Sequence, residues 1–145
     1  MARTSFLLAS VLCGTASALC PIQNSTTVAV FKGTGAASDC VSWETHFWDW
    51  WGAANPGKLE TVFLLNAQLQ RECQLANYPN LRMYVQPGGN AYDQQHTGIK
   101  STGKANILSF INKGKGHTYI GTCAGWFVTT KDYWWQGQHF RWVAA

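Results

Sequence analysis

The sequence predicts an α/β fold in which helices cover both faces of a mainly parallel sheet. Four short apolar segments alternate with segments of helical periodicity, which is the order expected when helices join parallel strands. Glycine-rich turns follow three of these four segments, at 33–35, 87–89 and 121–125. Because ligands of such sheets bind outside the carboxyl ends of the strands, these turns are the first candidates for a functional site.

The first predicted strand is 26–31 (TTVAVF), which is β-branched and apolar and ends at the first glycine-rich turn. Asp39 is the expected N-cap of the next helix. One face of this helix carries four aromatic residues at i, i+4, i+7 and i+8: Trp43, Phe47, Trp50 and Trp51. We expect Trp43 and Trp50 to pack against the sheet, and 55–57 (NPG) to end the helix.

The remaining elements alternate in the same way. They are a strand at 60–65, a short helix at 67–73, a strand at 81–85, a helix capped by Ser101 or Thr102 that carries Ile107, Leu108 and Ile111 and closes at Gly114, a strand at 117–120, and a helix starting within 126–130. The predicted order is therefore βαβαβαβα.

Composition and charge exclude several classes of protein. Of the 145 residues, 46% are apolar and 12% are charged, which is typical neither of a disordered chain nor of a coiled coil. The formal charge of +4, from 11 basic and 7 acidic residues, is scattered along the chain. Since no basic run could follow a phosphate backbone, we expect no nucleic-acid partner.

Residues 1–18 have the layout of a signal peptide. Arg3 precedes a short apolar core at 6–13, and Ala16-Ser17-Ala18 forms a small-x-small cleavage site. A buried amino-terminal helix is the alternative interpretation. Cleavage after Ala18 would leave a single domain at 19–145 with a charge of +3, secreted and without a membrane anchor.

Export would change how the cysteines are interpreted. Four remain after cleavage, namely Cys20, Cys40, Cys73 and Cys123. They allow three full pairings, and a free Cys123 would leave at most one disulfide among the other three. Asn24 begins an N-glycosylation sequon, Asn24-Ser25-Thr26, which the signal peptide makes relevant.

Two of the glycine-rich turns carry candidate chemistry. Gly121-x-Cys123-x-Gly125, between a strand and a helix, has the pattern of a nucleophile elbow with cysteine in place of serine. The amide of Ala124 could hold an oxyanion, and the amide of Gly88 or Gly89 could be the second donor. The alternatives are a small buried cysteine in a tight turn and an ordinary strand-ending turn.

Three segments carry a family resemblance: 84–94 (YVQPGGNAYDQ), 106–111 (NILSFI) and 119–127 (YIGTCAGWF). The chain resembles the biotin–protein ligase amino-terminal domain family over about 26–137. That family resembles a branch of the class I glutamine amidotransferase-like superfamily, so the resemblance implies a flavodoxin-like three-layer α/β/α fold. It also implies that Cys123 is the nucleophile and that Gly88, Gly89 and Ala124 form the oxyanion region. No ligase domain is present, so biotin transfer is not implied.

The chain departs from the amidotransferase pattern after Cys123. Only 22 residues follow, and they contain no His-x-Glu. We therefore expect an incomplete domain that lacks carboxyl-terminal strands. Two functions remain open: a cysteine-dependent enzyme acting on an amide-bearing small molecule, or a non-catalytic binding module. Carbohydrate binding through exposed tryptophans, with Trp134 and Trp135 as one platform, is a third.

Four histidines could replace the missing base. His96, expected in the loop after Gly89, is the first candidate and His139 the second. His46 is expected on the polar face of its helix, and His117 at the end of the sheet opposite Cys123. No metal-ligand spacing occurs, so we predict neither a metal nor a cofactor. Asp93 and Asp132 are expected to be solvated loop residues.

Overall fold

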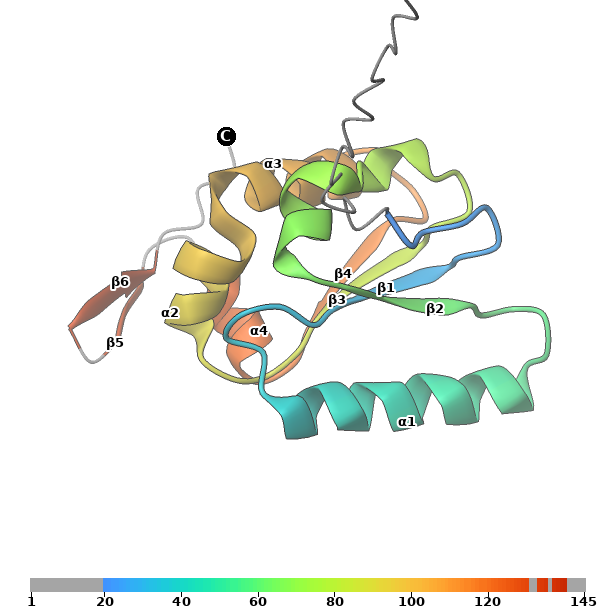
Figure 1. Cartoon of the computed structure of the whole chain (residues 1–145), viewed down its shortest axis with the longest axis horizontal. Coiled ribbons are helices and arrows are strands. Elements are labelled where there is room, and N and C mark those ends of the chain that lie inside the picture. The colour runs from blue at the N-terminus through green and yellow to red at the C-terminus, as the bar shows by residue number, and fades with distance from the viewer. Residues whose placement is uncertain (1–19, 131–132, 136, 141–145) are drawn as a thin grey trace, which may run out of the picture.

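The computed structural model describes residues 20–130, 133–135 and 137–140 (Figure 1). The predicted signal peptide and Asp132 lie outside these residues. The described elements are β1 (Val28–Phe31), α1 (Ser38–Ala54), β2 (Thr61–Leu64), η1 (Gln68–Glu72), η2 (Leu75–Asn77), β3 (Met83–Gln86), α2 (Ala91–Asp93), η3 (Gln94–Ile99), α3 (Lys100–Ile111), β4 (Thr118–Gly121), α4 (Ala124–Val128), β5 (Tyr133–Trp135) and β6 (Gln138–Phe140).

Four strands form one all-parallel sheet in the order β2-β1-β3-β4. β1 pairs with both β2 and β3, so the chain moves to one side of β1 with β2 and to the other with β3 and β4. The predicted α/β class and parallel sheet are confirmed. Each predicted strand is present, and no end differs from its predicted position by more than two residues.

The two faces of the sheet are buried against different helices, which gives three layers (Figure 1). Val28 and Val30 of β1 share a cluster with Trp48 of α1. Ala29 and Phe31 point to the other face and belong to the larger cluster, which also includes residues of η1, η2 and α3. This alternation follows from the period of two in a strand, and it explains why β1 is apolar at every position.

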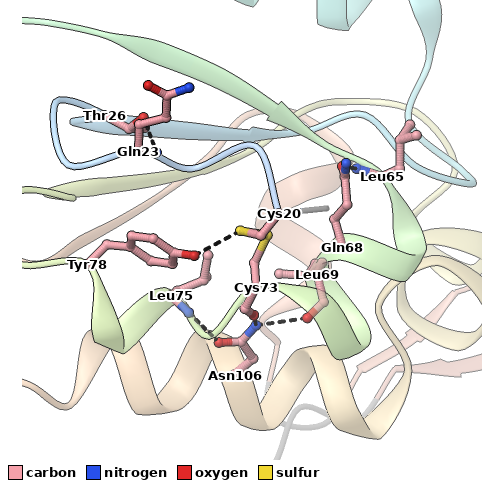
Figure 2. The surroundings of a disulfide bond; sticks show 10 residues. All are labelled: Cys20, Gln23, Thr26, Leu65, Gln68, Leu69, Cys73, Leu75, Tyr78 and Asn106. Carbon is pink, nitrogen blue, oxygen red and sulfur yellow. Dashed lines mark hydrogen bonds between the residues drawn. A yellow bond between two sulfur atoms is a disulfide. The ribbon is translucent and has the colours of Figure 1, made fainter. Parts of the chain in front are cut away.

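A disulfide fixes the start of the described chain to the layer that contains α3. Cys20 is bonded to Cys73, which is fully buried after η1 (Figure 2). Tyr78 donates its hydroxyl to Sγ of Cys20 at 3.1 Å. The structure thus contains one disulfide among the three cysteines considered, and it leaves Cys40 unpaired.

The orientation of α1 corrects one prediction. Trp43 is 75% exposed and Trp50 is 66% exposed, so neither packs against the sheet. The buried side chains of α1 are Val41 and Trp48, which lie seven residues apart on the opposite face. The aromatic residues do share one face of α1, but that face points away from the sheet. The face that contacts the sheet carries Val41 and Trp48.

The ends of two helices also differ from the prediction. α1 begins at Ser38 with Ala37 as N-cap, and the Asp39 carboxylate accepts from the amide of Cys40 inside the first turn. α3 begins at Lys100 and follows η3 directly, so neither Ser101 nor Thr102 caps it. The predicted ends near Asn55 and Gly114 are confirmed, since α1 stops at Ala54 and α3 at Ile111.

The segment after α4 that contains Trp134 and Trp135 includes a short hairpin. Tyr133–Trp135 forms β5, which pairs antiparallel with β6 as a hairpin. Figure 1 shows the hairpin extending beyond α2, away from the parallel sheet. Trp134 is exposed on it. Asp93 is not in a loop, because it ends α2.

Candidate functional site

Three glycine-rich turns meet at the carboxyl edge of the sheet. They follow β1, β3 and β4, as predicted, and Figure 1 shows α1, α2 and α4 starting at this edge. The first two turns are joined directly: Ala37 donates its amide to the carbonyl of Gly88 at 3.0 Å, and Asn90 donates to Gly35 at 2.8 Å. The bridge fixes the Gly88 turn beside the beginning of α1.

Cys123 has the backbone of an elbow. Its φ of 50° and ψ of −117° lie in a region that residues with a side chain rarely occupy. Gly121 precedes it by two residues and Gly125 follows by two, as the predicted motif requires. Cys123 is exposed and its thiol is free. The chain therefore turns sharply between β4 and α4 with the cysteine at its outer point.

Gly121 and Gly125 have no room for a side chain, because other backbone atoms lie close to their α-carbons. A β-carbon on Gly121 would lie 2.9 Å from the carbonyl carbon of Gly125, and one on Gly125 would overlap the carbonyl oxygen of Gln86. Tyr119 donates its hydroxyl to the Gly125 carbonyl at 2.7 Å and holds the turn from the strand side. Glycine therefore occurs at both positions of the motif because a side chain would clash there with the backbone.

Of the predicted oxyanion residues, Ala124 directly follows Cys123 and Gly88 lies beside it, whereas Gly89 packs against the backbone of Gly35 and Ala37. A β-carbon on Gly88 would lie 3.1 Å from Cβ of Cys123, so the two turns are in contact. Among the described residues, the amides of Gly88, Gly89 and Ala124 donate to no protein acceptor. α4 has only five residues, so its helix dipole is small and stabilises a negative charge on the Cys123 sulfur only weakly.

A buried glutamine holds the Gly88 turn in place, and sequence reasoning missed it. Gln94 donates from Nε2 to the carbonyls of Pro87 at 3.0 Å and Gly88 at 3.2 Å. Its Oε1 accepts from Nε2 of Gln86, which in turn accepts the hydroxyl of Tyr84. All three side chains are fully buried. The signal in the sequence was Gln86, a polar residue at the end of the otherwise apolar β3, because its buried amide needs a partner such as Gln94.

Cys40 and Glu44 of α1 were also missed, and both face the elbow. A β-carbon on Gly88 would lie 2.6 Å from Sγ of Cys40, so both free cysteines contact the same glycine. Thr122 donates its hydroxyl to Oε1 of Glu44 at 2.9 Å. Burial raises the pKa of the Cys40 thiol above its ordinary value, and the negative charges of Asp39, Cys123 and Glu44 raise it further.

The candidate histidines are not joined to Cys123. His96 lies on η3, not in a loop, and is exposed with its ring 4.2 Å from that of Tyr92. His46 is exposed on α1. His117 precedes β4, at the end of the sheet opposite Cys123 as expected. No hydrogen bond or ring contact links these three to Cys123 in the described structure. His139 lies in β6, where only the backbone is described.

The buried ring of His117 has an unusual environment. Both of its nitrogens lack a hydrogen-bond partner within the described structure. The ring packs edge-on against Phe110 of α3, with centroids 4.9 Å apart. The ring therefore contributes to the packing between α3 and the beginning of β4. His117 is therefore a structural residue.

A pocket of about 430 Å³ lies beside the beginning of α1, on a different face of the helix from Cys40 and Glu44. It is lined by Lys32, Ala36, Ser38, Val41, Ser42, Thr45 and His46. Cys123 is not among these residues, so the pocket is separate from the elbow.

Asn24 is exposed in a turn before β1, where a glycan would meet no obstacle from the core. Among the described helices, none has the length and apolar character to cross a bilayer. In the same part of the chain, no three His, Cys, Asp or Glu side chains converge to hold a metal ion.

Comparisons with protein-family models, with curated protein sequences and with solved structures find no match for this chain. What the site does is therefore inferred from its own residues.

Proposed function

We propose that Cys123 is the nucleophile of an acyl-transfer site in a secreted, flavodoxin-like domain of the glutamine amidotransferase type. The observation that carries the proposal is the backbone of Cys123, with φ 50° and ψ −117°, between two glycines at which a β-carbon would press against the backbone. Such strain persists only where the surrounding structure imposes it, and it clusters at functional sites. An exposed thiol at this point is accessible to a carbonyl substrate.

The chemistry follows from the groups around the elbow. The Cys123 thiolate attacks the carbonyl carbon of an amide, the C–S bond forms and the carbonyl electron pair moves to oxygen. The amides of Ala124 and of Gly88 or Gly89, which have no acceptor among the described residues, are the donors available to this oxyanion. Collapse expels the amine with a proton and leaves a thioester, which water hydrolyses to the acid and the free thiol.

Several features support the finer assignment. The strand order β2-β1-β3-β4 with helices on both faces is compatible with a flavodoxin-like sheet. The segments that resemble the biotin–protein ligase amino-terminal family, 84–94 and 119–127, include the Gly88 turn and the elbow that meet in space. The signal-peptide pattern at 1–18 and the exposed Asn24 support secretion and glycosylation.

The environment of Cys123 predicts a kinetic asymmetry. The described groups near it are acids and a second thiol, and no described histidine contacts it. Release of a poor leaving group and activation of water both need a base or acid in position. We therefore expect acylation by an activated ester to be faster than hydrolysis of the thioester, so that the acyl-enzyme accumulates.

The test is a burst experiment with p-nitrophenyl acetate on the reduced chain. We expect one equivalent of p-nitrophenol in a rapid phase, slow turnover afterwards, and one acetyl group on the peptide that contains Cys123. Cys123→Ser abolishes the burst, whereas Cys40→Ser, which changes the other free thiol, retains acetylation of Cys123. Acetylation of Cys123 only in unfolded protein would overturn the proposal.

A second candidate, carbohydrate binding without catalysis, is favoured by the outer face of α1. Trp43, Phe47 and Trp50 are 75%, 48% and 66% exposed on it. The two indoles are seven residues apart, or about 10 Å along the helix, and can cover the apolar faces of neighbouring sugar rings. Retention on insoluble chitin or cellulose tests this candidate. Trp43→Ala with Trp50→Ala should abolish retention, whereas Trp134→Ala, which changes an exposed indole on the hairpin, should not.

A further inference from the structure

The two free cysteines of the structure converge on one point. A β-carbon on Gly88 would lie 2.6 Å from Sγ and 3.4 Å from Cβ of Cys40, and 3.1 Å from Cβ of Cys123. The two residues come from the beginning of α1 and from the elbow after β4, so they are 83 positions apart in the printed sequence. Because Gly88 has no side chain, no side-chain atom of this residue lies between the two cysteines.

The fold keeps the pair in this arrangement from both sides. The amide of Ala37 at the start of α1 donates to Gly88, and Thr122 beside Cys123 donates its hydroxyl to Glu44 of α1. α1 and the elbow are therefore joined both through the Gly88 turn and directly. Neither cysteine takes part in the structural disulfide, which uses Cys20 and the buried Cys73.

The two thiols differ in access. Cys123 is exposed at the elbow, whereas Cys40 is half-buried. Burial and neighbouring negative charge also raise the pKa of Cys40. A small molecule in solution therefore meets Cys123 first, and Cys40 reacts with a sulfur that is already bound beside it. This is the division of roles between an attacking and a resolving cysteine.

We propose that Cys40 and Cys123 form a reversible dithiol–disulfide centre that reacts with low-molecular-weight disulfides. The thiolate of Cys123 attacks one sulfur of the small disulfide, whose S–S bond breaks and releases one thiol. The thiolate of Cys40 then attacks the Cys123 sulfur of the mixed disulfide and releases the second thiol. Two protein thiols are oxidised to one disulfide, the small disulfide is reduced to two thiols, and the two protons pass to these products.

The centre does not depend on the acyl-transfer proposal, although it would affect it. A Cys40–Cys123 disulfide removes the free thiol that acyl transfer needs. Oxidising conditions would then suppress acylation, and reducing conditions would restore it. In an extracellular setting, the thiol–disulfide balance of the surroundings would decide the state of the elbow.

The experiment is equilibration of the full chain in mixtures of reduced and oxidised glutathione, followed by acid quenching, intact mass and peptide mapping. We expect a loss of two hydrogen masses in wild type and a crosslinked peptide pair that contains Cys40 and Cys123. Cys40→Ser should instead accumulate one glutathione on Cys123. Cys123→Ser should take up far less glutathione, because Cys40 is less accessible.

Wild type that keeps glutathione on Cys123 as fully as Cys40→Ser does would overturn the proposal, and so would pairing of either residue with Cys20 or Cys73. The crosslink is mapped in wild type, so the result stands even if a variant folds poorly. Burst acetylation of the reduced chain is a separate readout. A crosslink without a burst would reject only the acyl-transfer function, and a burst without a crosslink would reject only the redox centre.

Discussion

Thr122 donates its hydroxyl to Oε1 of Glu44 at 2.9 Å, across 78 positions of the sequence. The contact joins the residue before the candidate nucleophile to the second turn of α1. It also places the Glu44 carboxylate near the thiol of Cys40, where it disfavours negative charge on that sulfur. Burial is the largest cause of the raised pKa of Cys40, and the charges of Asp39, Cys123 and Glu44 raise it further.

Neutralising the acids near Cys40 should therefore lower its pKa in a definite order. Asp39→Asn should lower it more than Glu44→Gln, because Asp39 has the larger influence and also hydrogen-bonds the thiol. Asp49→Asn, on the exposed part of α1, should leave it unchanged. The pH dependence of Cys40 alkylation in a Cys123→Ser background measures these shifts. Equal curves for Asp39→Asn and Asp49→Asn would contradict the prediction.

The elbow glycines should differ sharply from a glycine in α1. Gly125→Ala places a β-carbon against the carbonyl of Gln86 and should cost about 2–3 kcal/mol of unfolding free energy. Gly52→Ala is the control, because the nearest atom outside its helix, the carbonyl oxygen of Leu59, would be 4.0 Å from the new β-carbon; this variant should gain roughly 0.5–1 kcal/mol. Urea unfolding measures both. A Gly125→Ala chain as stable as wild type would show that the turn is not tightly packed.

The sequence was sufficient for features that depend on local pattern. Apolar runs located the parallel strands, and the Gly121–Gly125 spacing located the elbow, since both are set by neighbouring residues. It was insufficient for features set by tertiary contact. The aromatic period of α1 did not reveal that Trp48, rather than Trp43 or Trp50, faces the sheet. Nor could any spacing show that α1 brings a second thiol to Gly88.

Asn106 should be the most sensitive polar residue of the α3 layer. It accepts the amide of Leu75 at 2.8 Å and donates to the carbonyls of Leu69 and Cys73, so it satisfies the irregular backbone around the disulfide (Figure 2). Asn106→Ala leaves buried backbone groups unpaired and should cost about 3 kcal/mol. Ser109→Ala, on the exposed side of α3, should change the unfolding free energy by less than about 0.5 kcal/mol. Similar values for the two variants would contradict this role.

Tyr84, which is fully buried, and Tyr119, which is partly buried, should make the fold sensitive to alkaline pH. Burial raises the pKa of both Tyr84 and Tyr119, and Tyr119 raises that of Tyr84 further. Their hydroxyls donate to Oε1 of Gln86 and to the carbonyl of Gly125. Because the folded state keeps the protons, the stabilisation is complete below the ordinary tyrosine pKa of about 10 and is lost as pH rises above it.

Tyr119→Phe separates this effect from general alkaline unfolding. At neutral pH the variant should be less stable by about 1 kcal/mol, because the carbonyl of Gly125 loses its donor. Above the ordinary tyrosine pKa its unfolding free energy should fall less steeply than that of wild type, since one proton fewer is released on unfolding. The two curves should therefore converge as pH rises. Parallel curves, measured by urea unfolding across the alkaline range, would show that Tyr119 ionises as easily in the folded chain as in the unfolded one.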